Sequence, residues 1–323
     1  MARSRITHSR IDYVGRRSVT GAFPSLRRLR RRDRVAVLVF LLPATLAAAS
    51  LVTRHGPVAV LALIPAIFGL WGIVVSGVLL RIGYIGTGFS DPVVVSEAAR
   101  MRVLSGASPY GVGYPETTPP GWPFPYGPLA LLDSVPLELA ASIALLALLA
   151  WKGRPMTLAL YSGLPFSIYL ASAGNNDFIP ALLLASGLLA LPRAWGGVLI
   201  GLSVAWKPYT LVFVPVALAN GSLAAFVAAV AVTIGGWLPL LWWGGYPETV
   251  AMLNTLQGSS ALRFLAAPAS LAAFRWGVPA ACVAFVLLTM SSSVWSLGYL
   301  IPLGVALGIW LEPTYAPLPA ARP

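Results

Sequence analysis

Apolar segments close to the length of a membrane-spanning helix recur along this chain between residues 35 and 311. Inside a bilayer only helices and closed barrels satisfy their backbone hydrogen bonds, so this recurrence predicts a bundle of spanning helices. The composition agrees, because 58% of the residues are hydrophobic and 10% are charged, against about 25% charged in soluble domains. We therefore expect an all-α, polytopic membrane helical bundle of about 9 to 11 spans. The candidate spans are residues 35–53, 57–80, 135–151, 155–172, 178–192, 195–218, 222–243, 264–274, 276–290 and 294–311.

Prolines inside these runs predict that some spans are broken or re-entrant, because proline removes a backbone donor and membrane bundles tolerate such breaks. The single cysteine, Cys282, excludes a disulfide within the chain and a cysteine-based metal site. The two histidines, His8 and His55, lie too far apart in the sequence to suggest a metal pair. The prolines within the runs are Pro43, Pro65, Pro165, Pro208, Pro215 and Pro302.

The first 34 residues carry most of the net charge. They hold eleven arginines against Asp12 and Asp33, which gives +9 of the total of +12. Such a tail before the first apolar run is typical of a cytoplasmic anchor that binds anionic membrane lipids. Nucleic acid is not an expected partner, because Tyr13 and Phe23 alone interleave aromatic rings with the arginines. The predicted domains are a basic cytoplasmic tail at 1–34, a transmembrane domain at 35–311 and a disordered tail at 312–323.

One long polar stretch interrupts the apolar pattern, from Ser90 to Pro128, inside a predicted loop over residues 81–134. A chain of apolar helices that keeps such a loop is expected to use it for recognition or chemistry. Its many prolines favour a preformed site over a flexible linker. Its aromatic side chains fit either an interfacial belt or a surface for sugar rings and prenyl chains. They are Tyr110, Tyr114, Trp122, Phe124 and Tyr126.

The charges in short loops leave the topology in conflict. Lys152, Arg154 and Arg193 favour the cytoplasmic side for their loops, which puts the polar loop outside. The basic tail also belongs inside, yet two apolar runs separate it from the polar loop, and two full spans would return that loop to the cytoplasm. We expect residues 35–80 to form one span plus a re-entrant or in-plane piece that bends at residues 54–56.

Asp91 and Pro92 predict a helix start, with the aspartate as N-cap and the proline at the first helical position. Glu97 and Arg100 then pair across one turn. One interpretation is a capped amphipathic helix at the membrane surface. The other adds a function, with Asp91 as general base for an acceptor hydroxyl and with Arg100 and Arg102 neutralising a phosphate.

Four further positions carry polar groups at the ends of apolar runs or within them. Asp133 and Glu138 are expected to complement the N-terminus of the span that begins at residue 135. The turn Gly174-Asn175-Asn176-Asp177 offers hydrogen bonds to a polar ligand, although Asp177 could simply cap the next helix. Lys207 lies inside an apolar run beside Pro208, so we expect it at the junction of two half-helices with Asp177 as partner. A structural ion pair and a phosphate site are both open.

These segments together resemble a known group. An acid after an early span is followed by AARMRVLSGASPY (98–110), YGPLALL (126–132), GNND (174–177) and GLSVAWKPY (201–209). This order is similar to that in the GT-C superfamily of membrane glycosyltransferases, above all the polyprenyl-phosphate-mannose-dependent α-mannosyltransferases. The resemblance covers roughly residues 91–218, with a weaker echo at 291–303.

The resemblance implies inverting transfer of a mannosyl group from a polyprenyl-phosphate sugar to a lipid or glycan hydroxyl. Asp91 matches the acid that acts as base, and Lys207 matches the lysine near the donor phosphate. Asn176, Asp177 and the tyrosines of the site then bind donor phosphate or sugar. No cofactor is expected beyond the lipid-linked co-substrate, and a need for a divalent metal stays open. The tyrosines are Tyr110, Tyr126 and Tyr209.

The chain also departs from that group. It is short, and the segment from Ser293 to Tyr299 lacks the histidine pair that the family often carries there. Two other functions therefore stay open: a transporter or flippase for a lipid-linked or anionic solute, and a noncatalytic subunit of a membrane glycosylation complex. Broken helices around Lys207 suit a transporter, while the absence of a visible repeat weighs against the inverted-repeat type. We expect a multi-pass plasma-membrane protein whose active loop faces out of the cytoplasm; the sequence does not predict the oligomeric state.

Overall fold

The computed structural model describes residues 31–88, 90–118, 120–220, 222–257, 262–291 and 296–312. The predicted basic tail, apart from its last residues, and residues 313–323 lie outside these ranges. The described chain is all-α, as predicted. Its strands are two residues each, β1 (Gly113–Tyr114) and β2 (Trp122–Pro123), paired antiparallel within the polar loop.

Several of the predicted spans consist of two or more separate helices. Residues 155–172 form two helices, and residues 195–218 form three consecutive elements. The helical elements are α1 (Arg31–His55), η2 (Pro57–Phe68), α2 (Leu70–Gly83), α3 (Asp91–Leu104), η3 (Pro128–Leu132), α4 (Val135–Trp151), α5 (Pro155–Gly163), α6 (Pro165–Ala173), α7 (Phe178–Ala190), α8 (Ala194–Trp206), η4 (Pro208–Phe213), α9 (Val214–Ala219), α10 (Leu223–Trp237), α11 (Leu240–Trp243), α12 (Tyr246–Gln257), α13 (Leu262–Trp276), α14 (Val278–Met290), η5 (Leu297–Tyr299) and α15 (Leu300–Leu311).

Length limits how many of these helices could cross a membrane alone. Within the described ranges, residues 33–55 and 223–243 are long and apolar enough. A third span is possible if α5 and α6, which meet at an angle of 65°, count as one broken helix. The other apolar helices have 10–17 residues. The structure therefore does not establish the predicted count of spans, because prolines and glycines divide the apolar runs.

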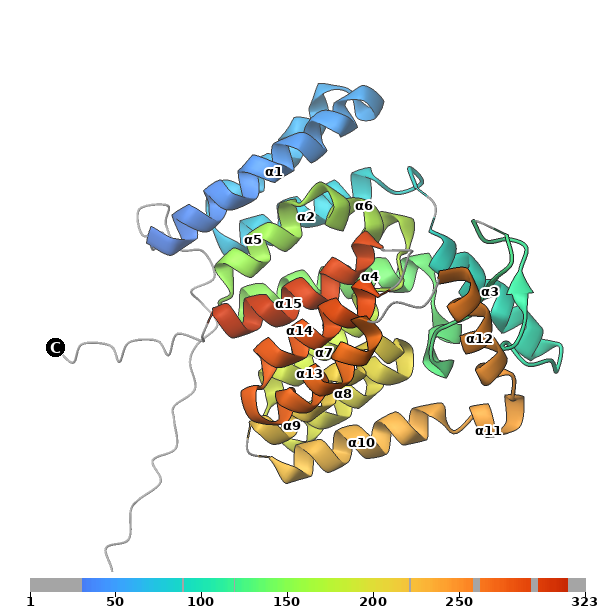
Figure 1. Ribbon diagram of the computed structural model, residues 1–323. Coiled ribbons are helices and arrows are strands. Elements are labelled where there is room, and N and C mark those ends of the chain that lie inside the picture. The colour runs from blue at the N-terminus through green and yellow to red at the C-terminus, as the bar shows by residue number, and fades with distance from the viewer. Residues whose placement is uncertain are drawn as a thin grey trace, which may run out of the picture.

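The first three elements run back and forth beside one another (Figure 1). The His55 Nε2 atom lies 2.9 Å from the Gly83 carbonyl oxygen, so α1 and α2 end at the same end of the molecule. Between them η2 runs in the opposite direction, from a turn at Gly56 to a second turn at Gly69 (φ 95°). The prediction of one continuous element over residues 57–80 is wrong, because Gly69 adopts a backbone conformation that other residues rarely reach.

A buried arginine joins this layer to the broken helix α5–α6. Arg81 is fully buried and donates hydrogen bonds to Ser142 Oγ (2.6 Å), Ser167 Oγ (3.2 Å) and the Tyr161 carbonyl oxygen (3.0 Å). In a continuous helix the Tyr161 carbonyl would accept from residue 165, but Pro165 has no N–H. Arg81 therefore satisfies the carbonyl that the proline leaves without its helical donor.

A carboxylate after the last helix, α15, bonds to the first turn of α5. Glu312, just after α15, accepts hydrogen bonds from Met156 N (2.7 Å), Thr157 N (2.8 Å) and Thr157 Oγ1 (2.5 Å) in the first turn of α5. Arg154 donates to the Ile309 carbonyl oxygen at 2.9 Å. These bonds satisfy free backbone groups at both helix ends and fix α15 against α5.

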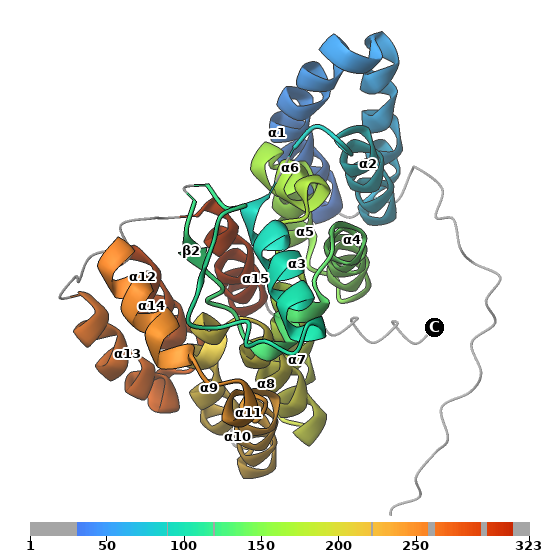
Figure 2. The same cartoon turned by 90° about the vertical axis from the view of Figure 1, so that its right-hand side faces the viewer.

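The polar loop gathers at one end of the molecule. There α3, the β1–β2 hairpin and α12 lie together, with α11 below them (Figures 1 and 2). Two buried apolar clusters meet behind this end. Phe178 and Trp206 belong to the cluster of α1, α2 and α4–α7, whereas Leu184 and Val204 belong to the cluster of η4, α9, α14 and α15. The junction of these clusters holds the polar groups described below.

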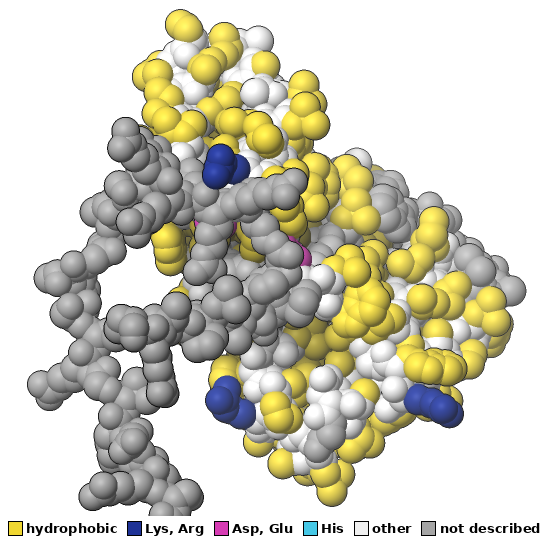
Figure 3. Space-filling model, turned by 90° about the vertical axis from the view of Figure 1, so that its left-hand side faces the viewer, with side chains coloured by type: hydrophobic (Ala, Val, Ile, Leu, Met, Phe, Trp, Pro, Cys, Tyr) yellow, Lys and Arg dark blue, Asp and Glu magenta, His cyan; other side chains and the backbone are white. Residues whose placement is uncertain are grey.

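The outer surface is strongly apolar. Figure 3 shows hydrophobic side chains over most of the described surface on one side, with few charged groups. On α1, Leu38, Leu42 and Leu46 are 67%, 78% and 67% exposed. In the candidate span at residues 223–243, only 11% of the most apolar stretch of 18 residues is buried. Apolar surface of this extent is unusual for a monomer in water.

Candidate functional site

Helix α3 brings Asp91 into a cavity without using its carboxylate as a cap. Ser90, with extended backbone, is the N-cap residue, and its side chain makes no capping hydrogen bond. Asp91 is the first helical residue, so the predicted N-cap position is wrong by one. Its Oδ1 atom is buried and has no hydrogen-bond partner in the described part of the chain. An oxygen buried without a partner in a cavity is costly, which marks it as a ligand-binding candidate.

The cavity at Asp91 has a volume of about 240 Å³. Four parts of the chain line it: the start of α3, the polar loop, α12 and the segment before α15. Its walls combine aromatic rings, rigid prolines and hydroxyl groups beside one carboxylate. The lining includes Asp91, Val95, Thr117, Thr118, Trp122, Tyr126, Leu253, Ser296 and Tyr299.

A second cavity of about 330 Å³ lies on the other side of Tyr126 and Tyr299, which line both. Tyr209 and Tyr246 add two further tyrosines to its wall, beside apolar residues of α12 and α14. The two cavities also share Leu253. A ligand with two parts could therefore occupy both, with its reacting bond near the shared wall.

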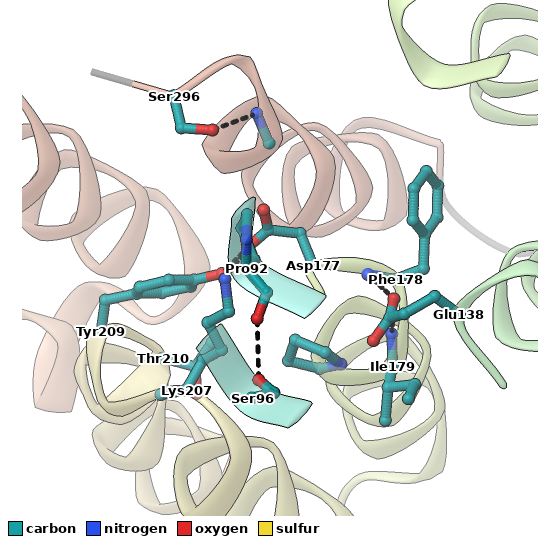
Figure 4. A network of polar contacts seen from close by, with 12 residues as sticks. Pro92, Ser96, Glu138, Asp177, Phe178, Ile179, Lys207, Tyr209, Thr210 and Ser296 are labelled. Carbon is teal, nitrogen blue, oxygen red and sulfur yellow. Dashed lines mark hydrogen bonds and ion pairs between the residues drawn. The ribbon is translucent and has the colours of Figure 1, made fainter. Parts of the chain in front are cut away.

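A buried ion pair supports that wall from behind (Figure 4). Lys207 Nζ lies 2.9 Å from Asp177 Oδ1, and their side chains are 3% and 2% exposed. The Tyr209 hydroxyl donates to the same carboxylate oxygen. Lys207 lies between the end of α8 at Trp206 and the start of η4 at Pro208. The predicted break and the predicted pairing with Asp177 are both confirmed.

Lys207 and Asp177 line neither cavity, but they hold residues that do. Lys207 Nζ lies 4.5 Å from the ring centroid of Tyr126 and 5.4 Å from that of Tyr209, within the range of cation–π attraction. Asn176 is fully buried, and its side chain lies beside the Tyr126 hydroxyl. These residues orient the two tyrosines, and the lysine faces the ligand space across the Tyr126 ring.

The segment before α15 packs directly onto Asp177. A Cβ atom at Gly298 would overlap Asp177 Oδ2, so only glycine fits there. Ser296 accepts a hydrogen bond from Gly298 N at 3.1 Å and reaches the Asp91 cavity, as does Tyr299. This segment is distinguished in the sequence by the histidines it lacks, and its place in the wall of the site was not predicted. No sequence signal distinguished Ser296 or Tyr299 from other polar residues.

Glu138 caps a helix other than its own. Its Oε2 atom accepts hydrogen bonds from Phe178 N (2.9 Å) and Ile179 N (3.2 Å) at the start of α7 (Figure 4). Asp177 sits at the N-cap position of α7 but makes no capping bond. Glu138 lies in the first turn of α4, as predicted, but the sequence did not predict that its hydrogen bonds go to α7. Its carboxylate stabilises α7 and leaves Asp177 to Lys207 and Tyr209.

Asp133, in the loop after η3, lies beside Glu138. It is fully buried, and neither of its carboxylate oxygens has a hydrogen-bond partner among the described residues. Burial raises the pKa of Asp133 to about 7, while the neighbouring Glu138 side chain and the charge of Lys207 act in the opposite direction. The network therefore holds more carboxyl groups than cations and retains protons near neutral pH.

Three predicted ligand residues lie away from both cavities. Arg102 Nε donates to the Ser108 carbonyl oxygen at 3.0 Å, which ties the end of α3 to the loop. Arg100 lies one turn after Glu97, 3.9 Å from its carboxylate, so the predicted pair is present. The Tyr110 ring packs 5.2 Å from that of Tyr246, and its hydroxyl donates to the Tyr126 carbonyl oxygen at 3.1 Å. Burial raises the pKa of the Tyr110 hydroxyl far above its usual range.

No cluster of three or more His, Cys, Asp or Glu side chains in the described ranges has the arrangement of a metal site. Comparisons with family models, with curated proteins and with solved structures each found no match to this chain.

Proposed function

We propose that this protein is an integral-membrane glycosyltransferase that moves a mannosyl group from a polyprenyl phosphate to a hydroxyl of a lipid or glycan. One observation carries the proposal: the buried Asp91 carboxylate oxygen without a partner, in a cavity of aromatic rings and hydroxyls. A carboxylate in this position is suited to accept the proton of an acceptor hydroxyl. Trp122 and Tyr126 offer flat faces for a sugar ring.

In the proposed reaction Asp91 takes the proton of the acceptor hydroxyl while that oxygen attacks the anomeric carbon of the donor. The bond between this carbon and the phosphate oxygen breaks, and the lipid phosphate leaves with the electron pair. A single displacement inverts the anomeric centre and needs one base. Tyr126 and Tyr299, which line the second cavity, are the proposed donors to the leaving phosphate, whereas the Tyr209 hydroxyl already donates to Asp177.

The apolar surface and the order of the first elements support a multi-pass membrane placement. We propose that α1, η2 and α2, which run in alternating directions, make three crossings, an odd number, with η2 and α2 as short crossings of 12 and 14 residues. With the basic tail bound to anionic lipids in the cytoplasm, Asp91 then faces the opposite side. This arrangement removes the conflict between the positive charges of the tail and those at Lys152, Arg154 and Arg193. We place the protein in the plasma membrane with its active loop outside the cytoplasm.

The test is transfer from radiolabelled polyprenyl-phosphate mannose to extracted lipids and glycans, in membranes that contain the full-length protein. We expect Asp91→Asn to lower transfer about 100-fold or more. Glu116→Gln removes an exposed carboxylate of the same loop and should leave transfer unchanged. Equal transfer by wild type and Asp91→Asn would show that Asp91 is not the general base. No transfer by wild type with several sugar donors would exclude the transferase.

A second candidate is a transporter or flippase for a lipid-linked or anionic solute. The buried Lys207–Asp177 pair at the junction of broken helices supports it, because transporter sites combine such charges with interrupted helices. It predicts uptake or flipping by reconstituted protein and no new glycosidic bond. A noncatalytic subunit would show neither activity alone.

A further inference from the structure

A third hollow lies apart from the two cavities of the candidate site. It has a volume of about 480 Å³ and is bounded by the C-terminal half of α3, by η3 and by the junction of α10 and α11. It shares no lining residue with either site cavity. Apart from Arg100, every residue that lines it is apolar or glycine, including Val103, Leu129 and Trp243. We name this hollow the α3–α10 groove.

Arg100 supplies a charge at the groove that the protein uses only in part. Its closest carboxylate, Glu97, lies 3.9 Å away and is 66% exposed, and exposed pairs of this kind contribute little. Its other partner is the Asp133 carbonyl oxygen at 3.3 Å, at the long end of hydrogen bonding. A guanidinium has five N–H donors, so most of them remain for an anion outside the protein.

The edge of the groove continues into exposed apolar surface. Leu104, Leu132, Leu241 and Trp242 are 73%, 62%, 79% and 79% exposed. The groove also lies at the end of the candidate span over residues 223–243, where a membrane helix meets the headgroup region. An aliphatic chain could therefore enter the groove from the bilayer while its headgroup stays at the level of Arg100.

We infer that the α3–α10 groove binds one acyl chain of an anionic glycerophospholipid whose phosphate pairs with Arg100. An apolar groove with a single cation fits a chain with one anionic head, whereas a sugar would leave its hydroxyls unpaired. The basic N-terminal tail is a poor occupant because its arginines would face Arg100. The inference uses the membrane placement proposed above and none of the transferase chemistry.

The lipid is distinct from the proposed sugar donor on geometric grounds. Arg100 follows Asp91 by nine residues on one helix, which is roughly 13 Å along its axis. A phosphate at Arg100 is therefore out of reach of the Asp91 carboxylate. The groove is a separate lipid site that packs between α3 and α10 and so supports the helix that carries Asp91.

Photochemical labelling tests this inference in full-length protein placed in phosphatidylcholine nanodiscs. A small fraction of phosphatidylglycerol carries a photoreactive group on one acyl chain, and mass spectrometry maps the labelled peptides. We expect labels within residues 100–104, 128–132 and 235–243. Arg100→Gln should lower labelling by this probe about fivefold, the effect of one basic residue at an anionic headgroup. Arg102→Gln, on the same helix but outside the groove, should change nothing.

A second variant fills the groove instead of removing its charge. Gly235 lines the groove, and a Cβ atom there would meet no other atom within 4 Å, so we expect Gly235→Leu to add its side chain at the groove. It should lower labelling by phosphatidylglycerol and by an equivalent phosphatidylcholine probe, whereas Arg100→Gln affects only the anionic probe. Unchanged labelling in both variants would overturn the site. Displacement by polyprenyl phosphate at lower concentration than by unlabelled phosphatidylglycerol would overturn the identity of the lipid.

The outcome does not depend on transfer activity, because labelling is measured without any sugar donor. Asp91→Asn should label like wild type. The labelling result would therefore stand even if the protein transferred no sugar. Likewise, absence of the lipid site would not change the interpretation of the transfer assay.

Discussion

Two aspartates begin two helices of this protein, and their surroundings are opposite. At the start of α7, Asp177 is bonded by Lys207 and Tyr209 and covered by Gly298. At the start of α3, Asp91 opens into a cavity with one buried oxygen that no described group bonds. A carboxylate whose bonds are all used within the protein holds structure, whereas one kept without partners is available to a ligand. The comparison predicts that changes at Asp177 affect folding and changes at Asp91 affect activity.

The largest effect on stability is expected from Lys207→Met. The change leaves the buried Asp177 carboxylate without its cation, and breaking a buried pair in this way costs about 3–5 kcal/mol. Thermal unfolding in detergent, followed by fluorescence, measures the loss. Lys152→Met, at a lysine in a loop near the surface, is the matched control and should unfold like wild type. A Lys207→Met protein of wild-type stability would refute the structural role of the pair.

The second-largest loss of stability is expected from Gly298→Ala. The added methyl group meets Asp177 Oδ2, so either the carboxylate or the segment before α15 must move, which costs roughly 1–3 kcal/mol. Gly235→Ala adds the same group in open space on a helix and should stabilise the protein slightly. The same unfolding assay compares them. If both substitutions change the unfolding temperature equally, Gly298 is not in close contact with the Asp177 carboxylate.

Asp133 should make stability depend on pH. Its pKa is raised to about 7 in the folded protein from an ordinary value of 3.8, so the folded state binds a proton that the unfolded state has already lost. Unfolding temperature should therefore fall as pH rises from about 4 to about 7 and then level off. Asp133→Asn should flatten this dependence. A wild-type unfolding temperature that rises over the same interval would show that another group dominates.

The smallest effect on stability is expected from Asp91→Asn, within about 0.5 kcal/mol of wild type. Its carboxylate makes no capping bond that the amide would lose. The amide is uncharged, so its burial should cost less free energy than burial of the carboxylate. The contrast with Lys207→Met is best measured on the same preparations used for the transfer assay. A strongly destabilised Asp91→Asn protein would mean that Asp91 is structural after all.

Local sequence rules predicted much of the centre of the site. A lysine inside an apolar run, followed by proline, predicted both the helix break and a buried partner, and Asp177 is that partner. The pair of Glu97 and Arg100 followed from helical spacing alone. These features depend on neighbouring residues and on the high cost of an unpaired charge in an apolar environment.

Features that depend on distant contacts could not be predicted in this way. Hydropathy does not show where a chain turns back. Residues 57–80 therefore resembled one element, although the chain reverses its direction at Gly69. Glu138 caps a helix whose first amide lies 40 residues away in the sequence. Ser296 and Tyr299 reach the cavity because Gly298 allows their segment to lie on Asp177. Each case requires the tertiary packing to be known first.

The bonds between Glu312 and the start of α5 limit how early these two parts of the chain can pack together during synthesis. Thr157 receives its carboxylate partner from a residue that lies 155 positions later in the chain. At a synthesis rate of roughly 5–20 residues per second, the start of α5 is made about 8–30 s before that partner exists. During this interval the first amides of α5 depend on water or on a chaperone of the insertion machinery. The contact between α15 and α5 therefore forms only after Glu312 has been synthesised, and we expect a nascent chain stalled before Glu312 to be cleaved by proteases more readily than the folded protein.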